Sequence, residues 1–316
     1  MDAMEEKVES IVWGGEEMLI NKIMNYCDLE YTKEHTDSRC ENCQHVGECS
    51  GGCKRCLEEI HYPLKYPKGK KSYDCPNLIN FYVCDYTFKY ATEIYYLLQK
   101  SAALKRITQY NVFSIGCGAC PDLMAFEAYI LKNKSGKTVQ SMGIDKNPLW
   151  KPVHEQVEQY TTDVITCTNL EIEDVFDFLD KIAVADINVL VLQYVISSLY
   201  ASEGENAIHK LFDLIIENVV KYRNKKEPFV IIINDVNSNN TGRELFLDLI
   251  SKLRRAGIHG HCEQYYFDRN IKNKAQIYGT KHQSSTAMTP ALVQKYGKYK
   301  PWQFCTSAQL LIEIGW

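Results

Sequence analysis

Short apolar runs rich in Val, Ile and Leu alternate with helical stretches, and this pattern constrains the fold more than any other feature. The first five runs are residues 112–115, 139–144, 164–167, 187–192 and 229–233. Strands this apolar are typical of parallel sheets that helices cover on both faces. Two later runs follow, at residues 264–267 and 310–314. The sequence therefore predicts an α/β fold with a seven-stranded sheet and helices on both faces.

A glycine-rich turn follows the first run and reads Gly116-Cys-Gly118-Ala-Cys-Pro121. An apolar helix begins directly after it. Such a turn lets the backbone approach a ligand, and the helix N-terminus favours negative charge. The second run ends in Gly143-Ile-Asp145, so a carboxylate lies where it can accept both hydroxyls of a ribose. Together the two motifs predict a nucleoside site.

A dinucleotide fold uses glycines and an acid in the same way. Its fingerprint needs a third glycine where this chain has Pro121, which is poorly suited to a close approach of pyrophosphate. A nucleoside without phosphates, such as S-adenosylmethionine, demands less of the loop. A turn without a ligand, in which the glycines serve geometry alone, is the other alternative.

From about residue 105 onward, the chain resembles the class I S-adenosylmethionine-dependent methyltransferases. The motifs that carry the resemblance are Phe113-Ser-Ile-Gly-Cys-Gly118, Gly143-Ile-Asp145, Thr166-Cys-Thr-Asn169-Leu170 and Val189-Leu-Val-Leu-Gln193-Tyr194. The last two strands, with a long insertion between them, resemble the family's antiparallel sixth and seventh strands. The resemblance implies a Rossmann-like methyltransferase fold and methyl transfer from S-adenosylmethionine.

The resemblance also implies the cofactor-binding residues, which are Gly116, Cys117, Gly118, Asp145, Lys146, Asn169, Leu170 and Gln193. The glycines would line the methionine part. Asp145 would hold the ribose, Asn169 and Leu170 would contact the adenine after the third strand, and Gln193 would lie beneath the sulfonium.

The chain departs from the family's pattern at three places. Many members carry an acid where this chain has Ser114, so the amino group of the cofactor needs another partner. Cys120 replaces a common glycine. The Asp/Asn-Pro-Pro-Tyr box of amino-group methyltransferases is absent after the fourth strand, which weakens the case for an exocyclic base nitrogen as acceptor.

Methyl transfer from a sulfonium needs mostly positioning and, for some acceptors, removal of a proton. Asp235 and Tyr194 are the candidate catalytic residues, and His154, in the loop predicted after the second strand, is a further candidate. All three follow predicted strands at the crevice. The alternative role for Asp235 is to cap the helix predicted over residues 245–253.

The chain has 13 cysteines, and four of those in its first 72 residues form two Cys-x2-Cys pairs. Cys40, Cys43, Cys53 and Cys56 predict a tetrahedral zinc site, and an iron–sulfur cluster is the less favoured alternative. A four-thiolate site has no open coordination position. We therefore expect a structural role or recognition of a protein partner.

Charge is distributed unevenly along the sequence. Residues 269–306 carry seven Lys or Arg and no acid, so a net charge of −4 leaves −11 on the rest of the chain. Aromatic residues lie between these cations, a combination typical of single-stranded nucleic-acid binding, with RNA favoured. The alternatives are a lid over a small-molecule or protein acceptor, and a solvated loop whose aromatic residues pack on the sheet.

The predicted organisation has two parts. Residues 1–72 form an N-terminal helix, over about residues 1–26, and the Cys-rich metal-binding module. Residues 73–316 form the methyltransferase-like domain, with docking helices over 73–110 and the basic insertion at 268–307. We expect no membrane association and a cytoplasmic location, because the apolar runs are strand-sized and no secretory signal is present. A non-catalytic binding or scaffold subunit with this fold is the alternative from another functional class.

Overall fold

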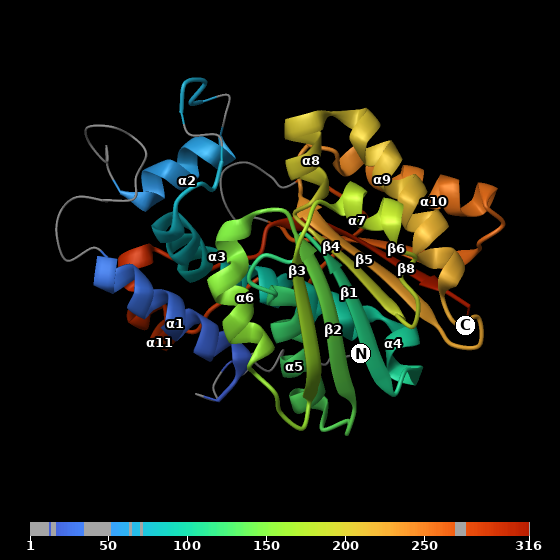
Figure 1. Cartoon of the computed structure of the whole chain (residues 1–316), viewed down its shortest axis with the longest axis horizontal. Coiled ribbons are helices and arrows are strands. Elements are labelled where there is room, and N and C mark those ends of the chain that lie inside the picture. Colours follow the sequence, from blue (N-terminus) through green and yellow to red (C-terminus); the bar gives the residue numbers. More distant parts are fainter. Residues whose placement is uncertain are drawn as a thin grey trace, which may run out of the picture.

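A computed structural model describes residue 13 and residues 17–34, 52–62, 65–69, 72–268 and 276–315 of the chain. Its centre is an eight-stranded sheet with the strand order β3-β2-β1-β4-β5-β8-β6-β7 (Figure 1). The strands are β1 (Gln109–Ile115), β2 (Thr138–Asp145), β3 (Ile165–Ile172), β4 (Val189–Gln193), β5 (Phe229–Val236), β6 (Gly260–Tyr266), β7 (Thr280–Lys281) and β8 (Ser307–Ile314).

The first five strands are parallel, and β8 lies antiparallel between β5 and β6. This arrangement confirms the predicted antiparallel end of the sheet. The prediction of seven strands was wrong by one. The additional strand, β7, has two residues paired with Tyr265 and Tyr266, and it lies in a polar segment without an apolar run to reveal it.

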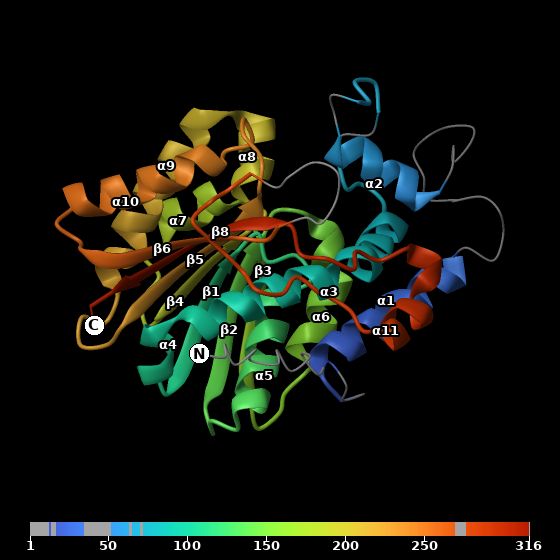
Figure 2. The same cartoon turned by 180° about the vertical axis from the view of Figure 1, so that it is seen from behind.

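Helices cover both faces of the sheet (Figures 1 and 2). One face carries α1 (Leu19–Glu34), α3 (Pro76–Lys100), α4 (Ala102–Arg106), α5 (Pro121–Asn133) and α6 (Lys151–Glu158). The other face carries α7 (Val175–Lys181), α8 (Ile196–Glu203), α9 (Glu205–Asn218) and α10 (Phe246–Arg255). The remaining helices are α2 (Cys53–His61) and α11 (Pro290–Lys295), with 3-10 turns η1 (Pro148–Trp150), η2 (Val220–Tyr222), η3 (Arg243–Leu245) and η4 (Gly297–Tyr299).

Alternate residues of the central strands supply the two cores. In β5, Val230 and Ile232 belong to the core under α3 and α5, while Ile231 and Ile233 belong to the core under α9 and α10. Both sides of the strand are thus removed from water, which explains why its first five residues, 229–233, are all apolar.

The long helix α3 lies within residues 73–110, where docking helices are predicted. Pro76 occupies its first turn, where a missing N–H costs no hydrogen bond. The helix is buried along nearly its whole length, because α1, α2 and α5 pack against it. Residues 285–306 also contact it, through the bond from the Trp302 N–H to the Asp85 carbonyl (3.0 Å).

The N-terminal helix differs from its predicted bounds. Residues 1–12 and 14–16 lie outside the described residues, and α1 continues to Glu34 rather than ending near residue 26. Ile20, Ile23 and Met24 are buried in the same core as α3 and α5. The two-part division at residue 72 stays a prediction, although α1 shares its core with the α/β part.

The basic insertion packs its tyrosines inside the protein. Tyr296 and Tyr299 are fully buried, and their hydroxyls donate to the side chains of Asn25 (3.0 Å) and Asp28 (2.6 Å) on α1. These two rings therefore contribute to the core, and they pack against α1 and α3 rather than on the sheet. Among the described helices, none has the length and apolar character needed to cross a membrane.

Candidate functional site

A hollow lies at the C-terminal ends of β1 and β4, between the glycine turn and α3. The space between the atoms that line it is about 430 Å³, a figure that includes open solvent. Its lining residues are Tyr82, Thr87, Tyr90, Ser114, Ile115, Gly116, Cys117, Gly118, Ala119, Pro121, Asp122, Val191 and Gln193. Of the eight predicted cofactor residues, the structure brings Gly116, Cys117, Gly118 and Gln193 together here.

The glycine turn depends on its glycines for a steric reason. Gly116 has φ +65°, and a Cβ at this position would lie 2.7 Å from Cγ2 of Val195. Gly118 has φ +50°, and its Cβ would lie 3.4 Å from the ring of Trp150. A side chain at Gly116 would meet both backbone strain and a close contact, which explains the glycine seen in the sequence.

Gln193 ends β4 and presents an unused acceptor to this region. Its Nε2 donates to the carbonyl of Tyr90 (2.9 Å), which fixes the amide. Its Oε1 is buried and has no hydrogen-bond partner among the described residues. A buried orphan acceptor is costly in a folded protein, so a ligand that approaches it closely would relieve the cost.

Asp145 lies beside the hollow and does not line it. Its Oδ2 accepts from the Gly118 N–H (3.1 Å) and its Oδ1 from the Asn147 N–H (3.0 Å). Burial raises the pKa of this carboxyl to about 6, against the lowering effect of those two bonds. Asp145 thus fixes the glycine turn through the hydrogen bond from the Gly118 N–H. Lys146 is exposed, with its Nζ 3.6 Å from Oε1 of Glu203.

The predicted adenine contacts lie inside the third strand and not after it, because β3 extends to Ile172. Asn169 is exposed, whereas Leu170 lines a second hollow between β3 and α6. The second hollow is also lined by Lys151, His154, Glu155, Glu158 and Ile172.

His154 connects the two hollows. Its Nε2 lies 2.8 Å from the carbonyl of Gly118 and 3.7 Å from Sγ of Cys117. The bond to a carbonyl requires a proton on Nε2, so Nδ1 is an acceptor, and it is buried without a partner in the described part of the chain. Burial lowers the pKa of His154, which keeps the ring neutral. The sequence placed His154 in a loop, but it lies on α6.

A carboxylate that the sequence analysis did not single out also lines the first hollow. Asp122 is in the first turn of α5, is 2% exposed, and accepts a short hydrogen bond at Oδ2 from the hydroxyl of Ser114. Burial raises the pKa of Asp122, although bonds from Ser114 and two backbone N–H groups oppose the rise.

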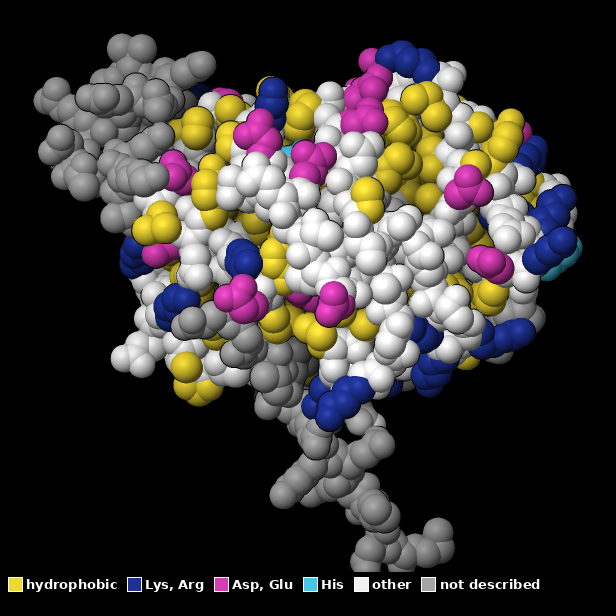
Figure 3. Space-filling view, turned by 60° about the horizontal axis from the view of Figure 1, so that its bottom comes forward, with side chains coloured by type: hydrophobic (Ala, Val, Ile, Leu, Met, Phe, Trp, Pro, Cys, Tyr) yellow, Lys and Arg dark blue, Asp and Glu magenta, His cyan; other side chains and the backbone are white. Residues whose placement is uncertain are grey.

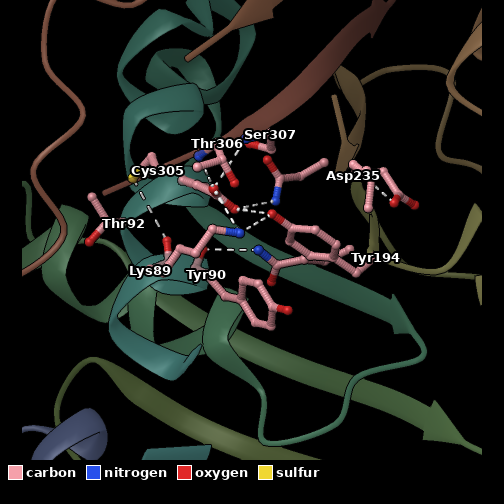
Figure 4. Close-up of polar contacts among 12 residues, drawn as sticks. Lys89, Tyr90, Thr92, Tyr194, Asp235, Cys305, Thr306 and Ser307 are labelled. Atoms are coloured by element: carbon pink, nitrogen blue, oxygen red, sulfur yellow. Dashed lines mark hydrogen bonds and ion pairs between the residues drawn. The ribbon is translucent and has the colours of Figure 1, made fainter. Parts of the chain in front are cut away.

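The candidate catalytic residue Tyr194 has its hydroxyl within a buried network (Figure 4). The hydroxyl donates to Oε2 of Glu93 (2.9 Å) and accepts from Nζ of Lys89. Its backbone has φ +57°, and its ring centroid lies 4.3 Å from that of Tyr90. Tyr194 does not line the hollow, and its catalytic role stays a prediction.

Glu93 is the centre of that network and is fully buried. Its Oε1 accepts from the backbone N–H groups of Thr306 (2.8 Å) and Ser307 (3.3 Å). Its Oε2 also accepts from Nδ2 of Asn234 (3.1 Å). Sequence reasoning missed Glu93 and Lys89, because both occur in a helix that otherwise reads as a packing element. The available signal was an acid four residues after a lysine in a helix that is otherwise mostly apolar.

Asp235 caps a helix, but not the predicted one. Its Oδ2 accepts from the N–H of Ser197 (3.0 Å) in the first turn of α8, and its Oδ1 from its neighbour Val236 (2.6 Å). Burial raises the pKa of Asp235 to about 6. The helix expected to need this cap begins instead as η3, with Gly242 before it. A catalytic role for Asp235 stays a prediction.

The predicted zinc site lies partly outside the described residues, because Cys40 and Cys43 are not among them. Cys53 and Cys56 lie three residues apart at the start of α2 and therefore on one side of the helix. No three His, Cys, Asp or Glu side chains in the described ranges group in a way that could hold a metal ion.

Comparison with solved structures finds S-adenosylmethionine-dependent methyltransferases. One from Archaeoglobus fulgidus matches 71% of this chain and 94% of its own, with 14% identity and a TM-score of 0.41. A putative class I enzyme from Listeria monocytogenes matches 95% and 88%, with 11% identity and a TM-score of 0.44. The plantazolicin methyltransferase BpumL, in complex with SAH, matches 92% and 98%, with 11% identity and a TM-score of 0.39.

No protein-family model matches the sequence, and no curated protein matches it either. The chain itself shows the parallel strands β1 to β5, the antiparallel β8 beside them and the glycine turn after β1.

Proposed function

We propose that this chain binds S-adenosylmethionine in the hollow beside the glycine turn and transfers its methyl group to an acceptor. The observation that carries the proposal is the convergence of three features on one hollow. These are a turn in which Gly116 leaves no room for a side chain, the unpartnered Oε1 of Gln193, and the buried carboxylate of Asp122.

Bound there, the cofactor would supply an activated methyl group, so the protein's task is mainly to position the acceptor and exclude water. Tyr82 and Tyr90 wall the hollow on the α3 side. Glu93 ties that helix to the strand ends through its bonds to Tyr194 and Asn234. The network therefore keeps the aromatic wall facing the glycine turn.

A calorimetric titration tests the cofactor proposal. We expect micromolar binding of S-adenosylmethionine by the full chain, and loss of that binding in Asp145→Ala, because Asp145 holds the N–H of Gly118 in place. Asp180→Ala, an exposed acid on α7, is the matched control and should bind as the wild type does. Absence of binding by folded wild-type protein would contradict the proposal. Tight binding without transfer to any acceptor would instead favour the non-catalytic alternative.

For the acceptor, we propose RNA, as the basic segment predicts. Lys295 and Lys300 are exposed and have no ion-pair partner among the described residues, whereas Lys298 pairs with Asp28 (2.7 Å). Because Tyr296 and Tyr299 are buried, any stacking on bases would fall to Trp302 and Phe304. Figure 3 shows basic and acidic side chains in small separate groups on the face in view, without a broad basic surface there.

The acceptor proposal is tested by measuring RNA binding of a variant with Lys295, Lys298 and Lys300 changed to Gln. Affinity should fall, and the slope of log affinity against log salt concentration should become shallower by about one for each phosphate that the variant no longer neutralises. Unchanged binding would remove this segment from the interface. A small-molecule or protein acceptor is the second candidate, favoured by the bonds from the Thr306 and Trp302 N–H groups that hold the segment against α3.

We also propose that Cys40, Cys43, Cys53 and Cys56 hold zinc. The helical spacing of Cys53 and Cys56 supports this, since it directs both thiols to one side of α2. Metal analysis of purified protein should give one zinc per chain, and Cys53→Ser/Cys56→Ser should lose it. A metal-free wild type that is fully folded would contradict the proposal.

A further inference from the structure

The first motif of this chain has a hydroxyl where many members of the family that its sequence resembles carry an acid. Ser114 is two residues before Gly116, next to the last residue of β1. A zwitterionic ligand in the hollow would then present its ammonium to a side chain without negative charge. The fold supplies a carboxylate at the same place from another element.

That carboxylate belongs to Asp122. Ser114 is 3% exposed and Asp122 is 2% exposed, and both line the hollow beside the glycine turn. The Ser114 hydroxyl donates to Oδ2 of Asp122, so the strand and the helix together fix the orientation of the carboxyl group. Ser114 thus has a positioning role, and the charge comes from Asp122.

The charge of Asp122 has no counter-charge in the described part of the protein. No Lys, Arg or His of those residues forms an ion pair with it, although most buried carboxylates are paired. Its other stabilising contacts are hydrogen bonds from Ser114 and from the backbone N–H groups of Leu123 and Asp122 itself. A buried carboxylate that borders the hollow and has no cation beside it is suited to receive one from a ligand.

We propose that Asp122 binds the α-ammonium group of the cofactor's methionine part, replacing the acid that is missing at position 114. This inference rests on the proposed function, because it names a partner for one group of the proposed cofactor. It predicts that this chain discriminates between ligands by their amino group, and that the discrimination resides in Asp122.

Calorimetry with two probes tests the inference. S-adenosylhomocysteine carries the ammonium, and its analogue with hydrogen in place of the amino group does not. We expect wild-type protein to bind the first at least about tenfold more tightly, since a charge-assisted contact in a buried site is worth that much or more. Asp122→Asn should bind the two probes within about twofold of each other, because the ion pair is absent.

Glu127→Gln is the matched control. Glu127 is on the same helix, is also 2% exposed, and accepts from the Leu19 N–H (2.9 Å) and the Tyr160 hydroxyl (2.5 Å), but it does not line the hollow. This variant should retain the tenfold preference. If Asp122→Asn does not fold, the double variant Ser114→Asp/Asp122→Ser carries the test, because it returns the acid to the strand and should restore the preference.

Two results would overturn the inference while leaving cofactor binding intact. The first is a wild type that binds both probes equally. The second is a folded Asp122→Asn that keeps the wild-type preference. A folded wild type that binds neither probe would overturn the proposed function, and the inference with it.

Discussion

The glycine turn and the Glu93 network lie next to each other in the fold and are built in opposite ways. The turn is a continuous segment whose shape is set by local backbone conformation, including Gly116 at φ +65°. The network joins Lys89, Glu93, Tyr194, Asn234 and Thr306 from four separate parts of the chain. One wall of the hollow is therefore a sequence motif, and the other is a product of tertiary structure.

The network should be the more important of the two for stability. In Glu93→Ala, Lys89 and the donors from Tyr194, Asn234, Thr306 and Ser307 lose a common acceptor, so we expect unfolding free energy to fall by about 3–5 kcal/mol. Urea denaturation measures this. Glu217→Ala, which removes an exposed pair with Lys221, should leave the midpoint unchanged. A decrease below about 1 kcal/mol in Glu93→Ala would show that the network contributes little.

The glycine turn should be the more important of the two for ligand binding. Gly116→Ala brings a Cβ to 2.7 Å from Val195 and adds strain at positive φ, so we expect cofactor affinity to fall at least about tenfold. Gly136→Ala is the control, because Gly136 also has positive φ (+64°) but open space around it. Its calorimetric affinity should match the wild type. If both substitutions lowered cofactor affinity equally, backbone strain alone would explain the loss, and the close contact with Val195 would play no part.

His282, which Gln309 links to Asn234 of the network, makes the free energy of unfolding depend on pH. His282 is 3% exposed, lies 4.3 Å from the ring centroid of Phe267, and has its Nε2 2.6 Å from Oε1 of Gln309. Gln309 in turn donates to Oδ1 of Asn234 (2.7 Å). Burial lowers the pKa of His282 from 6.5 to about 4. The unfolded chain therefore takes up a proton at this residue before the folded chain does.

Because of His282, the free energy of unfolding therefore falls as the pH falls from about 6.5 to about 4, by roughly 3 kcal/mol in total. In His282→Gln this contribution disappears, so the difference in unfolding free energy between variant and wild type should narrow toward pH 4. His259→Gln, at an exposed position, should retain the wild-type dependence on pH. Parallel pH profiles for wild type and His282→Gln would contradict the burial of a neutral imidazole.

Much of the fold was predictable because it depends on local pattern. The five parallel strands appear as apolar runs, and Pro76 and Pro121 mark the starts of α3 and α5. Thr280–Lys281 was not predictable, since a two-residue strand has no periodicity of its own. The end of β3 was misjudged because an edge strand can continue through exposed residues such as Asn169.

The site was predictable where backbone geometry defines it and unpredictable where distant side chains meet. Gly116, Gly118 and Gln193 were found from motifs, and all three line the hollow. Asp122 was missed as a ligand-facing acid because a helix's first turn is an ordinary place for Asp. Asp235 was predicted to cap the next helix along the sequence. It accepts instead from the Ser197 N–H of α8, a helix that precedes β5 in the chain.

The most direct test of the account is a crystal structure of the full chain with S-adenosylhomocysteine. We predict density for its amino-acid part between the Gly116–Gly118 turn and Tyr90, with the ammonium within hydrogen-bond distance of the Asp122 carboxylate. Density for the ligand elsewhere on the protein, or an unchanged hollow at saturating ligand, would contradict the central claim that this hollow is the cofactor site.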